Sequence, residues 1–361
     1  MALYLCVDCG GTKTSAVITD AHGTIVGRAP GGPSNLTYLT LEAFIAAVTE
    51  AVGNALKMAF SSHSQDPVAL PPLGPSPFAA AWFGVSGADS PVAIANITPS
   101  LSTLLGIPIG PNLIVANDTH LLAAPVRTHP DVTTAVAVIA GTGSIAVSFK
   151  EADKKIEELG RVGGWGWVLG DEGGGFHVGR EAIRQILMEE DQASVTAARP
   201  PASKLRDRVL QRFGVTNVME ILTGVYLPDP PPSVSVVKDT PTNLMPREKR
   251  LSTLTPLVFA AAFEDNDPLA LNILRACAAM LASQIAVLLG ESTAVKPQLV
   301  KAEECVICFG GSLVGIKEYR TMVLDGLAQR GHIFRYVEFI DDAAAGGAIG
   351  LAASYNPGDL A

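Results

Sequence analysis

Residues 3–29 read LYLCVDCGGTKTSAVITDAHGTIVGRA, and residues 134–162 read TAVAVIAGTGSIAVSFKEADKKIEELGRV. Both stretches have the order strand, glycine turn, strand, turn, strand, because apolar runs of strand length alternate with short polar turns. Gly10 and Gly141 mark equivalent places, 131 residues apart (141 − 10). A repeat on this scale predicts two similar domains, each opening with an antiparallel meander.

The rest of the chain adds helices and further strands to these meanders. Helical spacing of apolar residues is found at 41–60, 174–190 and 268–290. Strand-like runs lie at 79–87 and 112–118, and the segment 305–315 reads as a strand, Gly-Gly and then a helix. A small-residue helix is expected at 341–354, and polar or proline-rich loops at 61–78 and 227–242. This pattern predicts an α/β fold of two domains.

Composition narrows the possible partners. The chain has 361 residues, enough for two cores, and a net charge of −9 without any basic run. Nucleic acid and acidic membrane surfaces are therefore not expected as partners. No basic segment precedes the first apolar run, and the apolar runs fall short of the 18 or more residues of a membrane helix, so we expect a cytoplasmic protein without a signal peptide.

The five cysteines include two C-x-x-C pairs, Cys6 with Cys9 and Cys305 with Cys308. Both pairs lie in or at the end of strand-like runs, where residues i and i+3 face opposite sides. We therefore expect small buried hydrophobic side chains, and no zinc site or disulfide framework.

Three glycine turns are candidates for phosphate or nucleotide binding. The turn in DCGGTKTS (8–15) exposes successive N–H groups that can hold phosphate oxygens, although an ordinary hairpin has the same pattern. The turn GTGS (141–144) leads into a strand, which disfavours a dinucleotide-binding loop because that loop opens a helix. FGGS (309–312), between a strand and a helix, would let a flat ligand approach, or is a tight turn only.

Two further segments carry acidic residues. NLIVAND (112–118) places Asp118 at the end of an apolar strand, where it is either functional or a helix N-cap. The segment GRVGGWGWVLGDEGGG (160–175) combines eight glycines with two tryptophans and with Asp171 and Glu172. This composition favours a ligand loop in which an aromatic ring faces a sugar, with Glu172 as a helix-start residue.

These motifs together resemble a known superfamily. DCGGT, GTGS and CFGGSL resemble, in order, the two phosphate motifs and the adenosine motif of the actin/hexokinase/heat-shock ATPases. GPSN (32–35), GVSGAD (84–89), NDTHLLAA (117–124) and GGWGWVLGDEGGG (163–175) resemble the N-acetylglucosamine kinases. The likeness is weak over 61–78 and 190–255, and DEGGG stands where such kinases usually have DEGS.

The resemblance implies two duplicated ribonuclease-H-like (actin-like ATPase) domains with a cleft between them. The first would comprise 1–121 with 342–361, and the second 122–341. The connecting helices would lie at 119–126 and 341–354.

The resemblance also implies an activity, which is ATP-dependent phosphorylation of N-acetyl-D-glucosamine at its 6-hydroxyl. Asp118 would be the catalytic base, and Asp8 would position Mg²⁺ through water. Residues implied to bind the sugar are Asn35, Asp118, Gly164, Trp165 and Asp171. Residues implied to bind ATP are Gly10, Gly11, Thr12, Gly141, Thr142, Gly143, Gly311 and Ser312.

Other functions on the same fold stay open. The chain could be a kinase for glucosamine or another amino sugar. It could be an ATPase that activates a 2-hydroxyacyl-CoA dehydratase, although that role needs cysteines on loops to hold an iron–sulfur cluster between subunits. A non-catalytic sugar sensor would have no use for a base such as Asp118. A homodimer is left open.

Overall fold

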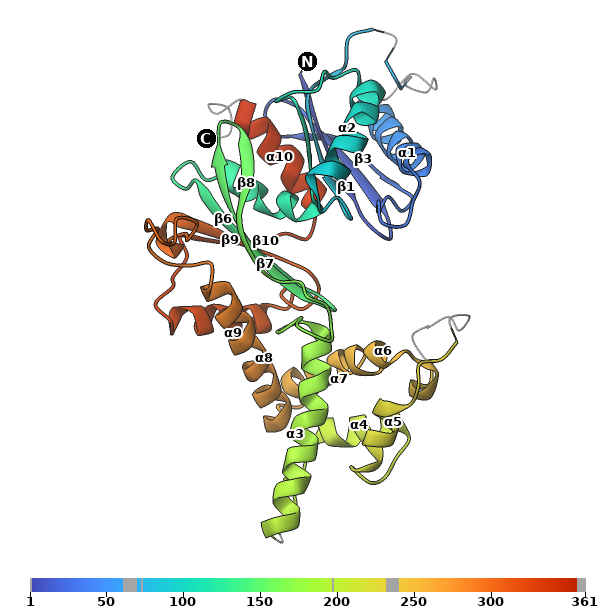
Figure 1. The fold of residues 1–361 in the computed structure, drawn as a ribbon, viewed down its shortest axis with the longest axis vertical. Coiled ribbons are helices and arrows are strands. Elements are labelled where there is room, and N and C mark those ends of the chain that lie inside the picture. The colour runs from blue at the N-terminus through green and yellow to red at the C-terminus, as the bar shows by residue number, and fades with distance from the viewer. Residues whose placement is uncertain (1, 61–69, 73, 197, 232–239, 356–361) are drawn as a thin grey trace.

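The computed structural model describes residues 2–60, 70–72, 74–196, 198–231 and 240–355. These residues form two five-stranded mixed sheets and a lobe of helices (Figure 1). Most of the predicted loop at 61–78, the middle of the segment 227–242 and the last residues, 356–361, lie outside the described residues.

The first sheet has the strand order β3-β2-β1-β4-β5. Its strands are β1 (Leu3–Cys9), β2 (Thr14–Thr19), β3 (Ile25–Gly31), β4 (Phe78–Val85) and β5 (Leu113–Ala116). Strand β2 pairs antiparallel with both β1 and β3. Strand β4 pairs parallel with both β1 and β5. The meander predicted at the start of the chain is confirmed.

The second sheet repeats this arrangement, with the order β8-β7-β6-β9-β10. Its strands are β6 (Thr134–Ala140), β7 (Ser144–Ala152), β8 (Lys155–Gly163), β9 (Cys305–Gly310) and β10 (Tyr336–Phe339). The meander β6–β8 is antiparallel, and β9 and β10 extend it in parallel. Each strand therefore has a counterpart at the same place in the first sheet.

Helices cover both sheets and build the separate lobe. They are α1 (Leu41–Ala59), α2 (Pro91–Leu105), the 3₁₀ helix η1 (Asp118–Arg127), α3 (Gly175–Thr196), α4 (Lys204–Phe213), α5 (Glu220–Tyr226), η2 (Thr242–Leu244), α6 (Arg247–Ser252), α7 (Thr255–Phe263), α8 (Pro268–Ala286), η3 (Ala302–Glu304), α9 (Lys317–Ala328) and α10 (Ala343–Tyr355). Figure 1 shows α1, α2 and α10 around the first sheet, and α3 to α9 on the far side of the second.

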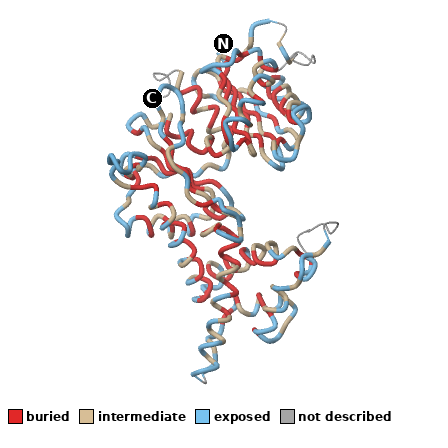
Figure 2. The backbone as a smooth tube through the Cα atoms, viewed as in Figure 1, coloured by how far each residue is buried: buried red, intermediate tan, exposed pale blue. Residues whose placement is uncertain are grey.

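Strand alternation assigns each face of the first sheet to one partner. Leu5 and Val7 of β1 join the core formed with α1 and α2, whereas Tyr4 and Cys6 join the core formed with η1 and α10. Because successive side chains point to opposite faces, Asp8 belongs to the η1 and α10 side. Figure 2 shows that buried segments run through both sheets.

The cysteine prediction is confirmed by the same alternation. All five cysteines are buried and free. Cys6 and Cys9 lie in different cores, on opposite faces of the first sheet, and Cys305 and Cys308 do the same in the second. Burial raises the pKa of each of these thiols, so they are small core side chains.

The two predicted connecting helices cross between the sheets. The segment 119–126 forms the 3₁₀ helix η1, which contains Pro125, and the segment 341–354 forms most of α10. Their approach depends on small residues, since a Cβ added to Gly350 would lie 2.9 Å from the backbone oxygen of Ala124. Both sheets pack against η1, which therefore fixes the side chains at its start relative to both.

Helix α8 is the one described helix that is long and apolar enough, by length and composition, to cross a membrane. The run lengths in the sequence did not indicate this. Its buried residues, among them Ile273, Leu274 and Leu281, pack in the core of the helical lobe. A core helix of a soluble protein has the same properties.

Candidate active site

A cavity of 380 Å³ lies where the first sheet, the second sheet and the start of α10 meet. Its lining residues are Asp8, Lys13, Ser15, Arg28, Ala29, Pro30, Leu122, Ile139, Gly310, Gly311, Ile340, Asp341, Asp342 and Ala343. Arg28 and Asp342 form an ion pair of 2.8 Å at its edge. The cavity thus joins predicted residues from both halves of the chain.

Three carboxylates meet beside this cavity. The pKa of Asp8 is raised to about 6, mainly by burial and also by the negative charges of Asp118 and Asp342, while the positive charge of Lys13 lowers it. Carboxylates that repel one another in this way favour a bound cation. Among the described residues no group of three acidic, histidine or cysteine side chains is arranged to hold a metal ion directly.

Asp118 begins η1, directly after β5. Asn117 caps this helix, because its side-chain oxygen accepts from the backbone N–H of Thr119 at 3.0 Å and its amide donates to Asp89 at 2.7 Å. The predicted alternative, an N-cap aspartate at 118, is therefore wrong by one residue. Burial raises the pKa of the Asp118 carboxyl, and a hydrogen bond from the Ser86 hydroxyl opposes that rise.

Ser86 links two of the predicted sugar-binding residues. The side-chain amide of Asn35 donates to Ser86 Oγ at 3.0 Å, and Ser86 in turn interacts with Asp118. The loop around Asn35 is fixed by further bonds, since its side-chain oxygen accepts from the backbone N–H of Thr37 at 2.7 Å. The structure thus brings Asn35 and Asp118 together, through a serine that the sequence reasoning did not select.

The first glycine turn joins β1 to β2. Gly10 donates its backbone N–H to the carbonyl of Lys13 at 3.0 Å, which closes the turn. Gly11, Thr12 and Lys13 are exposed. The backbone of this turn is therefore accessible to a ligand in the cavity that Lys13 lines.

The second glycine turn, Gly141 to Gly143, joins β6 to β7 and packs on the segment DEGGG. The backbone N–H of Gly175 donates to the carbonyl of Gly141 at 2.8 Å, and the backbone N–H of Ser144 donates to the carboxylate of Asp171 at 3.3 Å. A Cβ added to Gly143 would lie 2.8 Å from that carboxylate. The turn and Asp171 form one unit, and Thr142 is exposed at its tip.

The third glycine turn follows β9. Gly311 has a left-handed φ of 102°, and a Cβ there would lie 2.7 Å from the backbone oxygen of Ala140. Ser312 lies next to the second turn, because its hydroxyl is 3.9 Å from the position of a Cβ on Gly141. Helix α9 begins only at Lys317, so the predicted helix directly after Gly-Gly is wrong: a turn intervenes.

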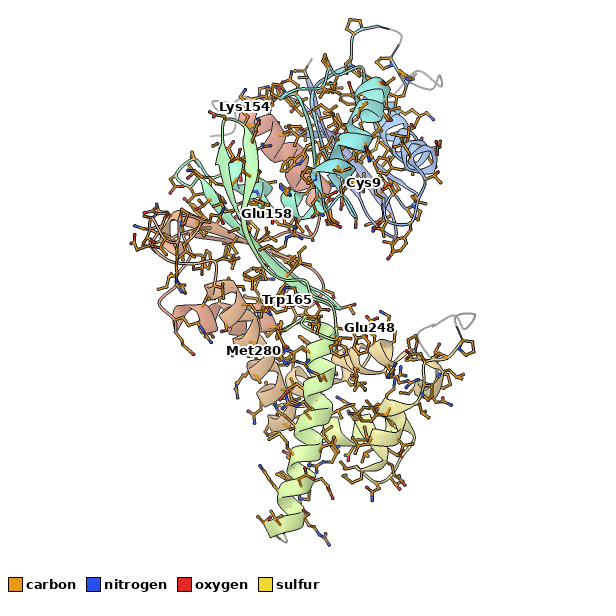
Figure 3. The ribbon with its side chains drawn as sticks, viewed as in Figure 1. Cys9, Lys154, Glu158, Trp165, Glu248 and Met280 are labelled. Atoms are coloured by element: carbon orange, nitrogen blue, oxygen red, sulfur yellow. The ribbon has the colours of Figure 1, made fainter. Side chains whose placement is uncertain are left out.

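The glycine-rich loop follows β8. Gly163, Gly164 and Gly166 all have left-handed φ angles, between 70° and 83°, which favour glycine. Trp165 is 64% exposed and lies between the β7–β8 hairpin and the start of α3 (Figure 3). Among the described residues no hydrogen bond or ion pair joins this loop to Asn35 or Asp118. The predicted sugar-binding residues are thus in two groups on two sheets.

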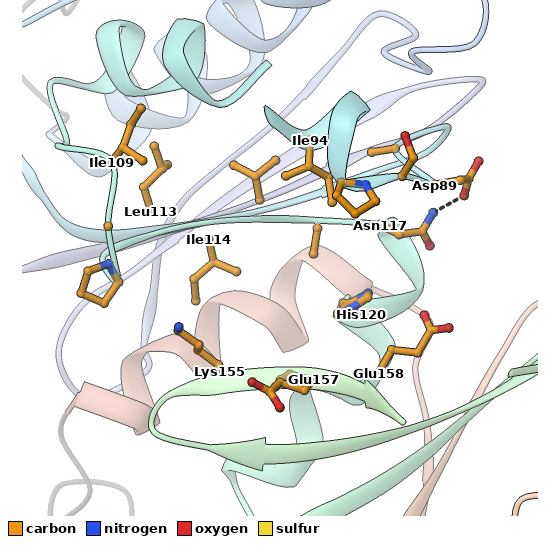
Figure 4. A pocket seen from close by; sticks show the side chains of 18 of the residues that line it. Asp89, Ile94, Ile109, Leu113, Ile114, Asn117, His120, Lys155, Glu157 and Glu158 are labelled. Atoms are coloured by element: carbon orange, nitrogen blue, oxygen red, sulfur yellow. Dashed lines mark hydrogen bonds between the residues drawn. The ribbon is translucent and has the colours of Figure 1, made fainter. Parts of the chain in front are cut away.

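A second cavity, of 770 Å³, lies between β5 and the β7–β8 hairpin (Figure 4). Its wall is largely apolar, with Ile94, Leu113 and Ile114 among its residues. Asn117 and Asp89, joined by a hydrogen bond, lie at one end. None of the residues predicted to bind sugar or ATP lines it, although Asn117 adjoins Asp118.

The fold and the site are those expected of an ATPase built on two mixed sheets, with glycine turns that are predicted to bind phosphate. The chain belongs to the BadF/BadG/BcrA/BcrD ATPase family, whose model matches residues 5–353. This confirms the superfamily resemblance.

Two characterised relatives match part of the chain. An N-acetyl-D-glucosamine kinase of Dictyostelium discoideum is 26% identical over 226 residues, 63% of this chain and 65% of the relative. An N-acetylmuramic acid/N-acetylglucosamine kinase of Clostridium acetobutylicum is 28% identical over 193 residues, 53% of this chain and 56% of the relative. The matches thus span less than two thirds of either relative.

Solved structures share the fold over nearly the whole chain. A candidate N-acetylglucosamine kinase of Porphyromonas gingivalis has a TM-score of 0.58 at 20% identity and covers 98% of this chain and 99% of its own. A hexokinase of the ROK type from Thermus thermophilus has a TM-score of 0.53 at 15% identity, with 97% of both chains covered. At this identity the likeness concerns the fold alone.

Proposed function

We propose that this chain is an ATP-dependent kinase of N-acetyl-D-glucosamine or a related amino sugar, which phosphorylates the 6-hydroxyl and releases ADP. The observation that carries the proposal is the chain of contacts Asn35–Ser86–Asp118, which ends in a half-buried carboxylate close enough to Asp8, in the wall of the 380 Å³ cavity, to raise its pKa. The two relatives named as N-acetylglucosamine kinases support the same substrate class.

The nucleotide would lie in the 380 Å³ cavity and along the second and third turns. Backbone N–H groups of Gly11, Thr12 and Thr142 would contact its phosphates, and Gly311 and Ser312 would contact the adenosine. Lys13 adds a positive charge to the lining. Asp8 and Asp342 would hold Mg²⁺ through water, and that ion would neutralise phosphate charge during transfer.

The sugar would bind between Asn35 and Asp118 on one side and Gly164, Trp165 and Asp171 on the other. Asp118 would accept the proton of the 6-hydroxyl as that oxygen attacks phosphorus. Because the two groups lie on different sheets, binding would require the sheets to approach, with η1 and α10 as the contact about which they rotate. Closure would also exclude water, which could otherwise take the phosphoryl group.

Several further assignments belong to the same proposal. The two ribonuclease-H-like domains would comprise 1–121 with 342–361, and 122–341. The packing of α10 on β1 and β4 supports placing it with the first domain. A cytoplasmic location and a homodimer remain predictions.

A coupled ADP-release assay over a panel of amino sugars and hexoses tests the proposal. We expect N-acetylglucosamine to give the highest kcat/KM and its 6-deoxy analogue to give no sugar-dependent ADP release. Activity with glucosamine above that with N-acetylglucosamine would change the substrate. No sugar-dependent release with any member of the panel would overturn the kinase assignment.

An ATPase that activates a 2-hydroxyacyl-CoA dehydratase is the alternative function on this fold. That activity needs accessible cysteines, whereas all five cysteines here are buried. A purified protein with the brown colour of an iron–sulfur cluster would favour the activator over the kinase.

A further inference from the structure

A third cavity, of 370 Å³, lies within the helical lobe, away from the phosphate turns. It is formed by α3, α5 and α6, and its lining residues are Trp167, Arg180, Ile183, Arg184, Leu187, Leu222, Val225, Tyr226, Arg247 and Leu251. Part of this wall comes from the region 190–255, where the resemblance to kinases is weak. A concave, largely apolar wall with a few polar groups is typical of a small-molecule site.

The charge of the lining is one-sided. Three of the ten lining residues are arginines and none is acidic. Each arginine has an acidic partner outside the lining. Arg180 pairs with Glu172 at 2.9 Å, Arg184 with Glu181 at 2.8 Å, and Arg247 with Asp229 at 3.4 Å. A guanidinium has five N–H donors, so one carboxylate leaves it able to bind another anion. Although each guanidinium charge is balanced by its carboxylate partner, the cavity concentrates N–H donors that suit an acid.

Aromatic rings give the apolar part its shape. Trp167 packs against Phe176 with ring centroids 5.1 Å apart, and Tyr226, on α5, is 74% exposed. Flat rings of this kind pack well against another flat apolar group. An occupant with an aromatic body would therefore bury more of the wall than a sugar or an inorganic anion would.

The cavity also touches the residues that brace the glycine-rich loop. Trp167 belongs to that loop, and Arg180 holds the carboxylate of Glu172. The backbone carbonyl of Glu172 accepts from the hydroxyl of Ser144 at 2.7 Å, at the second phosphate turn. An occupant of the cavity would thus contact Trp167 in the loop and Arg180, which holds Glu172.

We propose that this cavity is a binding site for a small molecule with an apolar, aromatic body and one carboxylate or comparable anionic group, and that its occupant contacts the glycine-rich loop through Trp167. The site goes beyond the proposed kinase function. Binding there needs neither ATP nor sugar, so its test stands or fails separately.

Isothermal titration with 4-phenylbutyrate and with its uncharged analogue 4-phenylbutan-1-ol tests the binding. The acid should bind at least about 10-fold more tightly, since a charge-assisted hydrogen bond adds roughly this much. Leu222→Trp, which fills the cavity, should abolish binding, whereas the control Val195→Trp, at a side chain 82% exposed on α3, should not. Arg247→Gln, at a half-exposed side chain, should reduce the preference for the acid without disturbing the fold, because two arginines remain in the lining.

Three results would overturn the proposal: no binding of the acid to the wild type, equal binding of acid and alcohol, or unchanged binding by both Leu222→Trp and Arg247→Gln. The contact with the loop has its own readout. In a Trp165→Phe background the acid should change tryptophan emission, and adding Trp167→Phe should remove that change. Binding heat without an emission change would contradict the contact.

Discussion

The carboxylate of Asp171 accepts a hydrogen bond from the backbone N–H of Ser144 and lies directly over Gly143. Asp171 also has a left-handed φ of 61°, which is unusual for a residue other than glycine. This geometry makes Asp171 part of the second glycine turn, which is predicted to bind phosphate, as well as of the loop predicted to bind sugar. A ligand of Asp171 would therefore affect the turn that we propose to hold the nucleotide.

This dual position gives the first prediction, for Asp171→Asn. The substitution preserves the shape and tolerates the left-handed backbone, but it weakens the bond to Ser144 because the acceptor loses its charge. We expect KM for the sugar to rise, and KM for ATP to rise less, while kcat changes by less than about 10-fold. Steady-state kinetics with each substrate varied in turn measures this. An unchanged sugar KM would remove Asp171 from the sugar site.

Trp165 gives the second prediction. Its side chain is largely exposed, whereas Trp82 is buried and Trp167 packs against Phe176. Binding of N-acetylglucosamine should bury Trp165 and change the protein's fluorescence, and Trp165→Phe should lose the change. Trp167→Phe is the matched control and should retain it. A sugar-dependent signal that persists in Trp165→Phe would move the assignment to another tryptophan.

The third prediction follows from the pKa of Asp8, which is raised from its ordinary 3.8 to about 6, mainly by burial. The folded state then binds the proton more tightly than the unfolded state, so stability falls as pH rises from about 4 to about 6 and stays lower above that. Asp8→Asn removes this loss, and at pH 7.5 it should raise the free energy of unfolding by up to about 3 kcal/mol. At pH 4 most of the difference should vanish.

Urea denaturation at both pH values, without nucleotide or Mg²⁺, measures the effect of Asp8→Asn. Asp153→Asn is a suitable control, because Asp153 is exposed in the β7–β8 turn with a φ of 51°, a conformation that asparagine tolerates. This control should show no comparable dependence on pH. Equal stability of the wild type and Asp8→Asn at pH 7.5 would show that Asp8 is better solvated or paired than its burial indicates.

The sequence predicted the sheets better than the helices. The strands of the two meanders, apart from the charged strand β8, are largely apolar runs bounded by short glycine or charged turns, so their limits are local properties of the chain. Helix α2 was missed because Pro99 lies inside it and its start is set by the Ser90 cap, a signal shared with many turns. The short helices between α3 and α8 are stabilised by packing in the helical lobe, and a short helix has little pattern of its own.

The parts of the candidate site that could be predicted are those where the backbone conformation requires a particular residue type, above all glycine. The glycine turns at 10, 141 and 311 are visible as glycine pairs after apolar runs, and a Cβ at Gly143 or Gly311 would lie 2.8 Å or 2.7 Å from a neighbouring atom. Ser86 was missed: one hydroxyl in GVSGAD has no periodic signal, and only folding brings it to Asn35, 51 residues earlier. Asp342 meets Asp8 across almost the whole chain for the same reason.

Ser86 gives the fourth prediction. Its hydrogen bond lowers the pKa of Asp118, because it favours the ionised carboxylate. Ser86→Ala should therefore raise that pKa, and the acid limb of the profile of kcat/KM against pH should move to higher pH. Ser90→Ala, which removes only the cap of α2, is the control and should leave the limb in place. A shift to lower pH, or none, would show that Ser86 does not act on Asp118.

The last prediction separates Asp118 from the other acids of the site. Asp118 is held by η1, between two packed sheets, and its pKa is raised by burial, so the carboxylate is a stronger base than an exposed one. Asp118→Asn keeps the shape and the contact with Ser86 but removes the basicity. We expect kcat to fall by about 10²-fold or more, while the affinity for ATP, measured by titration, survives.

Asp89→Asn is the matched control: Asp89 accepts from Asn117 and only adds negative charge near Asp118, so its effect on kcat should stay within about 10-fold. If Asp171→Asn abolished turnover and Asp118→Asn changed kcat only slightly, the two residues would exchange roles, with the base on the glycine-rich loop and Asp118 as a ligand of the sugar.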